Sequence, residues 1–174
     1  MRDLLRQRTS LKEEIEILLN NQVKMEAEAS AKYMAMAAWC DRNGFRYSAK
    51  YFMKQSEEER EHMVKIFNYL MFVGGNAISP EVSAVRQEYP TFKSVFEAAL
   101  QSEIAVTQSI NRIVTQSRKE EDYATENFLQ WFVKEQTEEE DNARHALELF
   151  DVIGEEGTGQ YFIDKAVGKI GHED

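Results

Sequence analysis

Four long stretches of this chain carry apolar residues at alternating spacings of three and four positions, a pattern typical of helices that bury one side. The stripe in the first stretch consists of Ile15, Leu19, Gln22, Glu26, Ala29, Tyr33, Met36 and Cys40. No stretch of any length follows the two-residue period of a strand, and the 174 residues include only two prolines and eight glycines. The sequence therefore predicts an all-α protein with four long helices over about residues 10–154.

The other three stripes follow the same rhythm. The second consists of Phe45, Ala49, Phe52, Ser56, Glu59, Met63, Ile66, Leu70 and Val73. The third consists of Phe96, Ala99, Glu103, Val106, Ile110, Ile113 and Ser117. The fourth consists of Phe128, Phe132, Glu135, Glu139, Asn142, Ala146, Leu149 and Ile153.

Turn and capping residues mark the predicted helix ends. Ser10 is the expected N-cap of the first helix, where Glu13 would complete a capping box. Glycines end the first, second and fourth helices, in Asn43-Gly44, Gly74-Gly75 and Gly154.

The lengths of the links predict how the helices are connected. The first and third links are short, so each joins antiparallel neighbours. The second link, about residues 76–90, could span about 45 Å at about 3.3 Å per residue, so it can cross the bundle and start the third helix parallel to the second. A short amphipathic helix at about 158–170 should cap an end of the bundle or pack between subunits.

Acidic residues interrupt each stripe near the middle of its helix. They are Glu26, Glu59, Glu103 and the pair Glu135 and Glu139. Helix midpoints share one height in a bundle, and His62 lies one turn after Glu59, so these groups should meet at one buried level. Bound cations would relieve the cost of burying them, and oxygen ligands with one imidazole suit iron or manganese. The alternative is that the stripes are assigned one position off and these glutamates face solvent.

Composition limits the classes of function. The 21 basic and 31 acidic residues leave a net charge of −10, which argues against nucleic-acid or anionic-membrane binding and favours cations. The single cysteine, Cys40, fits a reducing compartment and is expected to be buried. Residues 1–8 lack an apolar signal core and no run reaches membrane-spanning length, so we expect a soluble cytoplasmic protein. His145, four residues after Asp141, could be a secondary metal contact, but an exposed ion pair with Asp141 is favoured, and His172 lies in the tail.

The chain resembles the bacterial non-haem ferritins over about residues 11–165. The most specific stretches are Glu58-Glu59-Arg60-Glu61-His62-Met63, Phe128-Leu129-Gln130-Trp131-Phe132-Val133-Lys134-Glu135-Gln136-Thr137-Glu138-Glu139-Glu140 and Tyr161-Phe162-Ile163-Asp164-Lys165. The resemblance implies a single ferritin-like domain over residues 1–174: an antiparallel four-helix bundle with a long crossover and a short C-terminal fifth helix. It also implies self-assembly into a homo-oligomeric cage of about 24 subunits.

The resemblance implies a di-iron ferroxidase centre with named ligands. The implied ligands of the first iron are Glu26, Glu59 and His62. Glu59 would bridge to the second iron, whose other implied ligands are Glu103 and Glu139.

Further residues are implied beside that centre. Gln136 would lie next to the second iron, and Tyr33 would hydrogen-bond a ligand carboxylate and supply an electron. A third iron site is implied at Glu58, Glu135 and Glu138, with Glu139 shared.

Departures from neighbouring families narrow the resemblance. Arg60 stands where bacterioferritin has its haem-ligating Met, and Glu138 stands where it has a second His, so no haem is expected. A single cysteine excludes the Cys-rich iron module of rubrerythrins. At positions that line acidic channels in many animal ferritins, this chain has Glu126 but Leu129, which leaves the iron route open.

Three hypotheses about function follow. The leading one is iron storage and detoxification by a ferroxidase that oxidises Fe²⁺ with O₂ or H₂O₂ and stores ferric oxyhydroxide inside the cage. The second is a passive iron-storage or scaffold cage without ferroxidase activity. The third is a monomeric di-iron oxidase acting on an organic substrate, which would need a pocket beside the metals.

Overall fold

The computed structural model describes residues 9–171 as five helices joined by turns and one long link, with no strand in that range. The helices are α2 (Glu13–Arg42), α3 (Arg46–Phe72), α4 (Phe92–Lys119), α5 (Tyr123–Ile153) and the short α6 (Gly159–Val167). The predicted all-α four-helix bundle with a short C-terminal helix is confirmed. His172 and the N-terminal segment 1–8 lie outside the described residues.

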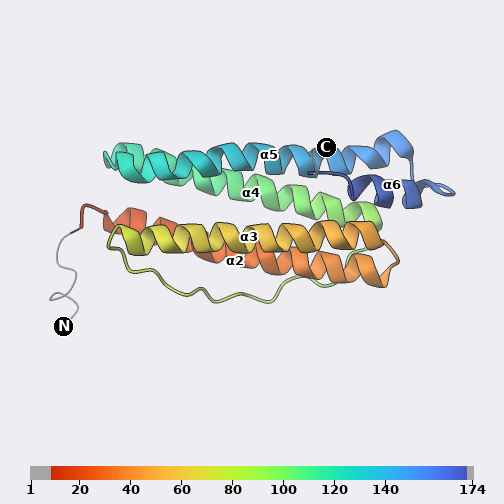
Figure 1. The fold of residues 1–174 in the computed structure, drawn as a ribbon, viewed down its shortest axis with the longest axis horizontal. Coiled ribbons are helices and arrows are strands. Elements are labelled where there is room, and N and C mark those ends of the chain that lie inside the picture. The colour runs from red at the N-terminus through yellow and green to blue at the C-terminus, as the bar shows by residue number, and fades with distance from the viewer. Residues whose placement is uncertain (1–8, 172–174) are drawn as a thin grey trace.

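The four long helices lie side by side as two antiparallel pairs (Figure 1). One pair is α2 and α3, and the other is α4 and α5. The link between α3 and α4 returns along the whole length of the bundle, so α4 starts beside the start of α3 and runs parallel to it (Figure 1). This is the crossover that the long second link predicts. None of the helices in the described part of the chain combines the length and apolar character needed to cross a bilayer.

Most helix ends follow their local residues. Gly44 adopts a φ of +90°, a conformation that favours glycine, directly after the Asn43 C-cap of α2. Thr91 caps α4 and forms a capping box with Ser94. The predicted Ser10 cap is wrong, because α2 begins after Lys12, which makes no side-chain capping bond. Here Thr9 instead donates to the Val73 carbonyl across the end of the bundle, at 2.5 Å.

Polar contacts fasten the long link to α2. Asn20 donates to the Asn76 carbonyl at 3.0 Å and accepts from the Ile78 amide at 2.9 Å. Near the other end of the link, Arg42 pairs with Glu88 at 2.7 Å. These bonds replace the regular backbone pairing that an extended segment lacks.

The core consists of two apolar halves. One is centred on Phe52, Phe96 and Phe150, and the other contains Leu19 and Ile110. Because the stripes of α2, α3 and α4 carry glutamates between these halves, a buried polar layer crosses the middle of the bundle. The predicted stripes of these three helices are confirmed at nearly every position, and Cys40 is buried as expected.

The predicted stripe of α5 is partly wrong. Its buried residues are Thr125, Leu129, Phe132, Gln136, Glu139, Ala143, Ala146 and Phe150. Of the residues in the predicted stripe, only Phe132, Glu139 and Ala146 are among these buried residues. Phe128, Glu135, Asn142 and Leu149 are half-buried and Ile153 is exposed. The helix is rotated from the predicted orientation, because a three–four spacing fits two neighbouring stripes and packing selects one.

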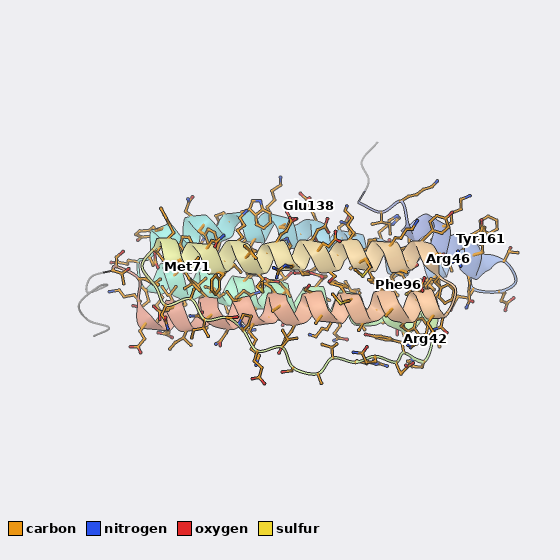
Figure 2. The ribbon with its side chains drawn as sticks, turned by 60° about the horizontal axis from the view of Figure 1, so that its bottom comes forward. Arg42, Arg46, Met71, Phe96, Glu138 and Tyr161 are labelled. Carbon is orange, nitrogen blue, oxygen red and sulfur yellow. The ribbon has the colours of Figure 1, made fainter. Side chains whose placement is uncertain are left out.

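The short helix α6 folds back onto one end of the bundle, against α3 and α5 (Figure 1). Gly159 has no room for a side chain, since a Cβ there would lie 1.9 Å from the Gly154 carbonyl oxygen. Ile163 and Val167 are buried in the core, whereas Tyr161 is exposed at the tip (Figure 2). The predicted capping of one bundle end is therefore confirmed within the subunit.

Candidate metal centre

Glu26, Glu59 and His62 converge at the middle of the bundle. One potential ligand atom from each lies within 4.8 Å of the other two, and all three side chains are buried. Glu26 comes from α2, while Glu59 and His62 lie one turn apart on α3. His62 Nδ1 is 3.2 Å from Glu59 Oε2. The alternative that these glutamates face solvent is wrong for Glu26, Glu59 and Glu103, which are 0%, 1% and 1% exposed. On α5, Glu139 is also buried, whereas Glu135 is only half-buried.

A chain of hydrogen bonds orients Glu26. Gln22, one turn earlier on α2, donates its amide to Glu26 Oε1 at 2.7 Å. Ser109 of α4 donates to Gln22 Oε1 at 2.5 Å, which fixes the direction of that amide. The other carboxylate oxygen, Glu26 Oε2, has no hydrogen-bond partner. These hydrogen bonds thus hold Glu26 Oε1 in place and leave Glu26 Oε2 available to a ligand.

Glu103 occupies the same layer but is held by different neighbours. Tyr33 of α2 donates its hydroxyl to Glu103 Oε1. Gln136 of α5 donates to Glu103 Oε2 at 3.1 Å. Both oxygens of Glu103 therefore accept a hydrogen bond. Among residues 9–171 two clusters have three potential ligand atoms within 4.8 Å of one another, here called metal-competent groups, and Glu103 belongs to neither.

Glu139 joins a second group with His62 and Glu135. Its three potential ligand atoms also lie within 4.8 Å of one another. Gln55 of α3 donates to Glu139 Oε2 at 2.7 Å, while His62 Nε2 lies 3.9 Å from Glu135 Oε1. His62 is shared by the two groups, so they adjoin.

Burial shapes the protonation of these acids. Loss of hydration raises the pKa of Glu26, Glu59 and Glu103, and the charge of Glu59 adds to the effect at Glu26. Burial and the nearby Glu103 raise the pKa of Glu139 to about 7. Burial beside Glu103 also raises the pKa of Tyr33 well above its ordinary value, so its hydroxyl remains a donor. The layer therefore favours protons or cations.

The donor set fits a metal ion. Glu26 Oε2, Glu59 Oε1 and Gln136 Oε1 are buried oxygens without a hydrogen-bond partner. Such atoms are costly unless something else compensates them. A divalent cation would supply that compensation, and carboxylates with one imidazole suit iron, manganese or zinc.

The residues predicted for a third site are placed differently. Glu135 belongs to the group with His62, as described above. Glu58 pairs with Lys54 at 3.4 Å, and Glu138 pairs with Lys134 at 3.8 Å. The Glu138 side chain is 61% exposed and lies along the outer side of the bundle (Figure 2). Neither Glu58 nor Glu138 belongs to a metal-competent group among the described residues, so the third site stays a prediction.

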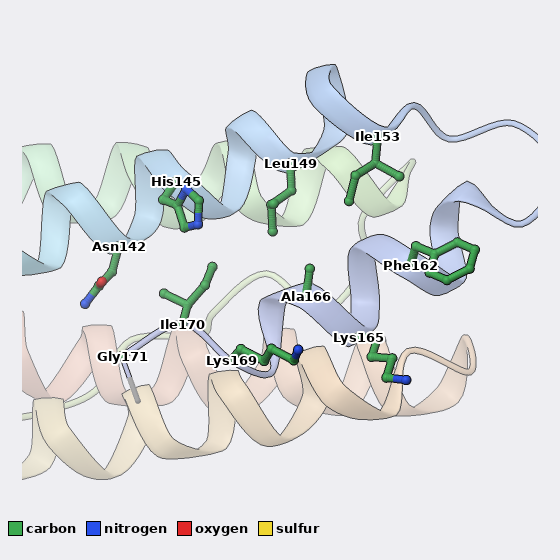
Figure 3. A pocket seen from close by; sticks show the side chains of 10 residues that line it. All are labelled: Asn142, His145, Leu149, Ile153, Phe162, Lys165, Ala166, Lys169, Ile170 and Gly171. Atoms are coloured by element: carbon green, nitrogen blue, oxygen red, sulfur yellow. The ribbon is translucent and has the colours of Figure 1, made fainter. Parts of the chain in front are cut away.

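His145 is exposed and lies away from the centre. It lines a cavity of about 700 Å³ between α5 and α6, which contains no residue of the carboxylate layer (Figure 3). The predicted ion pair with Asp141 is wrong, because Asp141 pairs with Arg144 at 3.1 Å. Leu129 is fully buried in the core, and Glu126 pairs with Arg118 at 2.6 Å.

Sequence reasoning assigned no site role to three residues that contact the proposed ligands, Gln22, Gln55 and Trp131, or to Ser109, which contacts Gln22. Trp131 of α5 packs edge-to-face on His62, with ring centroids 5.4 Å apart. Gln22 left a signal, because it is a polar residue inside an apolar stripe. The bonds made by Gln55 and Ser109 join residues 84 and 87 positions apart, and spacing along one helix gives no sign of them.

The fold and this layer define a class: a four-helix-bundle protein with a buried carboxylate–histidine cluster. A family profile for the ferritin-like domain matches residues 17–153. A bacterial non-haem ferritin-like protein of Haemophilus influenzae is 39% identical over 92% of this chain and 97% of its own length. The bacterial non-haem ferritin of Campylobacter jejuni is 34% identical over 92% of this chain and 96% of its own length. The chain belongs to the ferritin-like family.

Solved structures support the same assignment. An open-pore ferritin from Archaeoglobus fulgidus superposes with a TM-score of 0.88 at 32% identity. The match covers 91% of this chain and 97% of the archaeal chain. The resemblance to bacterial non-haem ferritins is thereby confirmed.

Proposed function

We propose that this protein stores iron and is a ferroxidase that oxidises Fe²⁺ with O₂ or H₂O₂ at the buried carboxylate layer. The observation that carries this proposal is the pair of unpartnered carboxylate oxygens, Glu26 Oε2 and Glu59 Oε1, beside His62. Anionic oxygen ligands favour Fe³⁺ over Fe²⁺, so such a site makes the oxidation more favourable. The names of the relatives, bacterial non-haem ferritins, support the same cargo.

The resemblance to ferritins assigns the proposed roles, and the two ligand clusters support part of them. Glu26, Glu59 and His62 bind one Fe²⁺, and Glu59 bridges to a second bound by Glu103 and Glu139. The two oxygens of Glu103 accept hydrogen bonds from Tyr33 and Gln136, so these two residues orient the carboxylate for that second position. Glu139 and Glu135 lie within reach of the shared His62. We keep the third site at Glu58, Glu135 and Glu138 as part of this proposal, and the assembly as a cage of about 24 subunits.

The chain's own side chains prepare the layer for the cation. Each raised carboxyl pKa means that binding Fe²⁺ displaces protons, which leave the layer as the ligands ionise. Burial and the neighbouring Glu103 keep the Tyr33 hydroxyl protonated. Tyr33 can give an electron together with that proton to the oxidant. The apolar halves of the core on each side keep bulk water out of the layer.

The test is stopped-flow absorbance after mixing anaerobic Fe²⁺-loaded protein with O₂. A fast ferric signal at about two irons per chain supports a coupled di-iron ferroxidase. Glu59→Ala and His62→Ala should slow the reaction sharply, while Glu61→Ala, exposed on the same helix, should not. Oxidation no faster than in protein-free buffer would reject the ferroxidase and favour the passive cage. Light scattering separates either cage from a monomeric oxidase of 20.2 kDa.

A further inference from the structure

A lysine covers the one tryptophan that contacts the metal centre. Trp131 is 39% exposed, and its indole makes a T-shaped contact with the His62 imidazole, with ring centroids 5.4 Å apart. Lys65 lies three residues after His62 on α3, and its Nζ is 3.3 Å from the centroid of the Trp131 ring. The ammonium, the indole and the imidazole thus follow one another from the surface to the buried cluster.

Three neighbouring side chains attract the Lys65 ammonium in this position. The electron-rich face of an indole attracts a cation, and Trp is the strongest such partner among the aromatic side chains. The Phe132 ring lies beneath the same ammonium at 5.9 Å, and Glu135 is close enough to act on it electrostatically. Lys65 is half-buried, so part of its interaction is shielded from water.

The charge on Lys65 affects how readily the indole loses an electron. Removing one electron from Trp131 would create a positive charge under an existing positive charge only 3.3 Å away. Like charges at this distance repel strongly outside bulk water, so the ammonium disfavours the oxidised indole. The other tryptophan, Trp39, is 6% exposed and packs against Phe45 and Tyr89, without a described cation over its own ring.

We propose that Lys65 is a positioning residue that holds Trp131 against His62 and protects this indole from oxidation by the oxidants of the adjacent centre. The proposal rests on the proposed ferroxidase function for its biological purpose. The geometry itself involves only Lys65, Trp131 and His62, so it can also be tested without iron.

The unwanted reaction that Lys65 opposes can be written in full. In the two-electron form, one oxygen atom of hydrogen peroxide adds to the indole and the other leaves as water. In the one-electron form, an electron passes from the indole to a radical oxidant, and the indole N–H proton passes to water. In both forms Trp131 is oxidised and the peroxide or radical is reduced.

The first experiment measures oxygen addition at each tryptophan after repeated cycles of Fe²⁺ and H₂O₂, by peptide mass spectrometry. Lys65→Met keeps the length of the side chain and removes its charge, and should raise oxidation of Trp131 about fivefold. Lys65→Arg keeps a cation over the ring and should resemble the wild type. Lys50→Met, an exposed lysine on the same helix, is the matched control, and Trp39 is the internal reference.

The second experiment omits iron. Azide radicals, which take one electron and become azide anions, are generated by radiolysis in the iron-free variants, and the same peptides are analysed. The same order of the variants is expected. If the wild type fails to oxidise Fe²⁺ at all, the proposed function fails while this experiment still decides the role of Lys65.

Three results would overturn the proposal. One is equal oxidation of Trp131 in Lys65→Met and Lys50→Met. Another is a rise in Lys65→Arg as large as in Lys65→Met, since the charge would then be irrelevant. The third is a parallel rise at Trp39, which would show a loosened fold rather than a lost local charge.

Discussion

Asp164 of α6 caps the N-terminus of α3 through the backbone amide of Ser48, which donates to Asp164 Oδ1 at 2.7 Å. The Tyr47 amide also donates to this carboxylate, at 3.3 Å. The N-cap residue of α3, Phe45, makes no side-chain capping bond, so α6 supplies the cap that the local sequence lacks. An acid at a helix N-terminus also interacts favourably with the helix dipole.

Asp164→Ala should therefore lower the free energy of unfolding by about 1–2 kcal/mol, because two amides lose a buried acceptor. Urea unfolding followed by circular dichroism measures the change. Asp151→Ala is the control, since its ion pair with Lys93 at 2.8 Å is exposed and should matter by less than about 1 kcal/mol. Equal stabilities of the two variants would refute the cap.

Tyr33→Phe should slow Fe²⁺ oxidation by about tenfold or more while leaving the fold intact. The variant loses the hydroxyl that donates to Glu103, but keeps the ring that stacks on Phe52 at 5.9 Å between centroids. Stopped-flow absorbance gives the rate, and thermal unfolding checks the fold. Tyr161→Phe, exposed on α6, should behave as the wild type. An unchanged rate in Tyr33→Phe would remove Tyr33 from the mechanism.

The iron-free protein should lose stability as the pH rises from about 4.5 to about 7, owing in part to Glu139. Its pKa is raised in the folded state, so the folded protein binds this proton more tightly than the unfolded chain between those values. The contribution of Glu139 to the free energy of unfolding therefore falls as the pH rises from about 4.5 to about 7, and is constant above about pH 7.

Glu139→Gln replaces the carboxyl by a neutral group of the same shape and should remove this part of the pH dependence. The variant should be more stable than the wild type at about pH 8, and close to it at about pH 5. Urea unfolding of metal-free protein across this range provides the comparison. The prediction would be contradicted if the free energies of unfolding of the wild type and the variant changed in parallel with pH. Bound metal should also flatten the wild-type curve, because it replaces the displaced protons.

Gln22→Met should weaken binding of Fe²⁺ by about tenfold, because Glu26 loses the donor that orients it. Ser109→Ala should have a smaller effect in the same direction, since it frees only the far end of the Gln22 amide. Anaerobic calorimetry with Fe²⁺ measures both affinities. Gln130→Met, an exposed position on α5, controls for the substitution itself. If Gln22→Met binds as tightly as Gln130→Met, the hydrogen-bond chain does not position Glu26.

The amino-acid sequence by itself determined the helices, their connectivity and the convergence of acids. The stripes of α2, α3 and α4 are each mostly apolar at one set of positions, so their buried faces could be assigned locally. Glu26, Glu59 and Glu103 interrupt those stripes near the helix midpoints, and equal heights in a bundle bring them together.

Only the tertiary structure decided the rotation of α5 and the contacts that orient the ligands. Leu129 and Phe128 compete for neighbouring stripes, and the choice depends on the shapes of the facing helices. The bonds from Ser109 to Gln22, Gln55 to Glu139 and Ser48 to Asp164 join residues 84 to 116 positions apart. Periodicity describes one helix at a time, so it predicts which side of a helix is buried but not which residues of other helices contact that side.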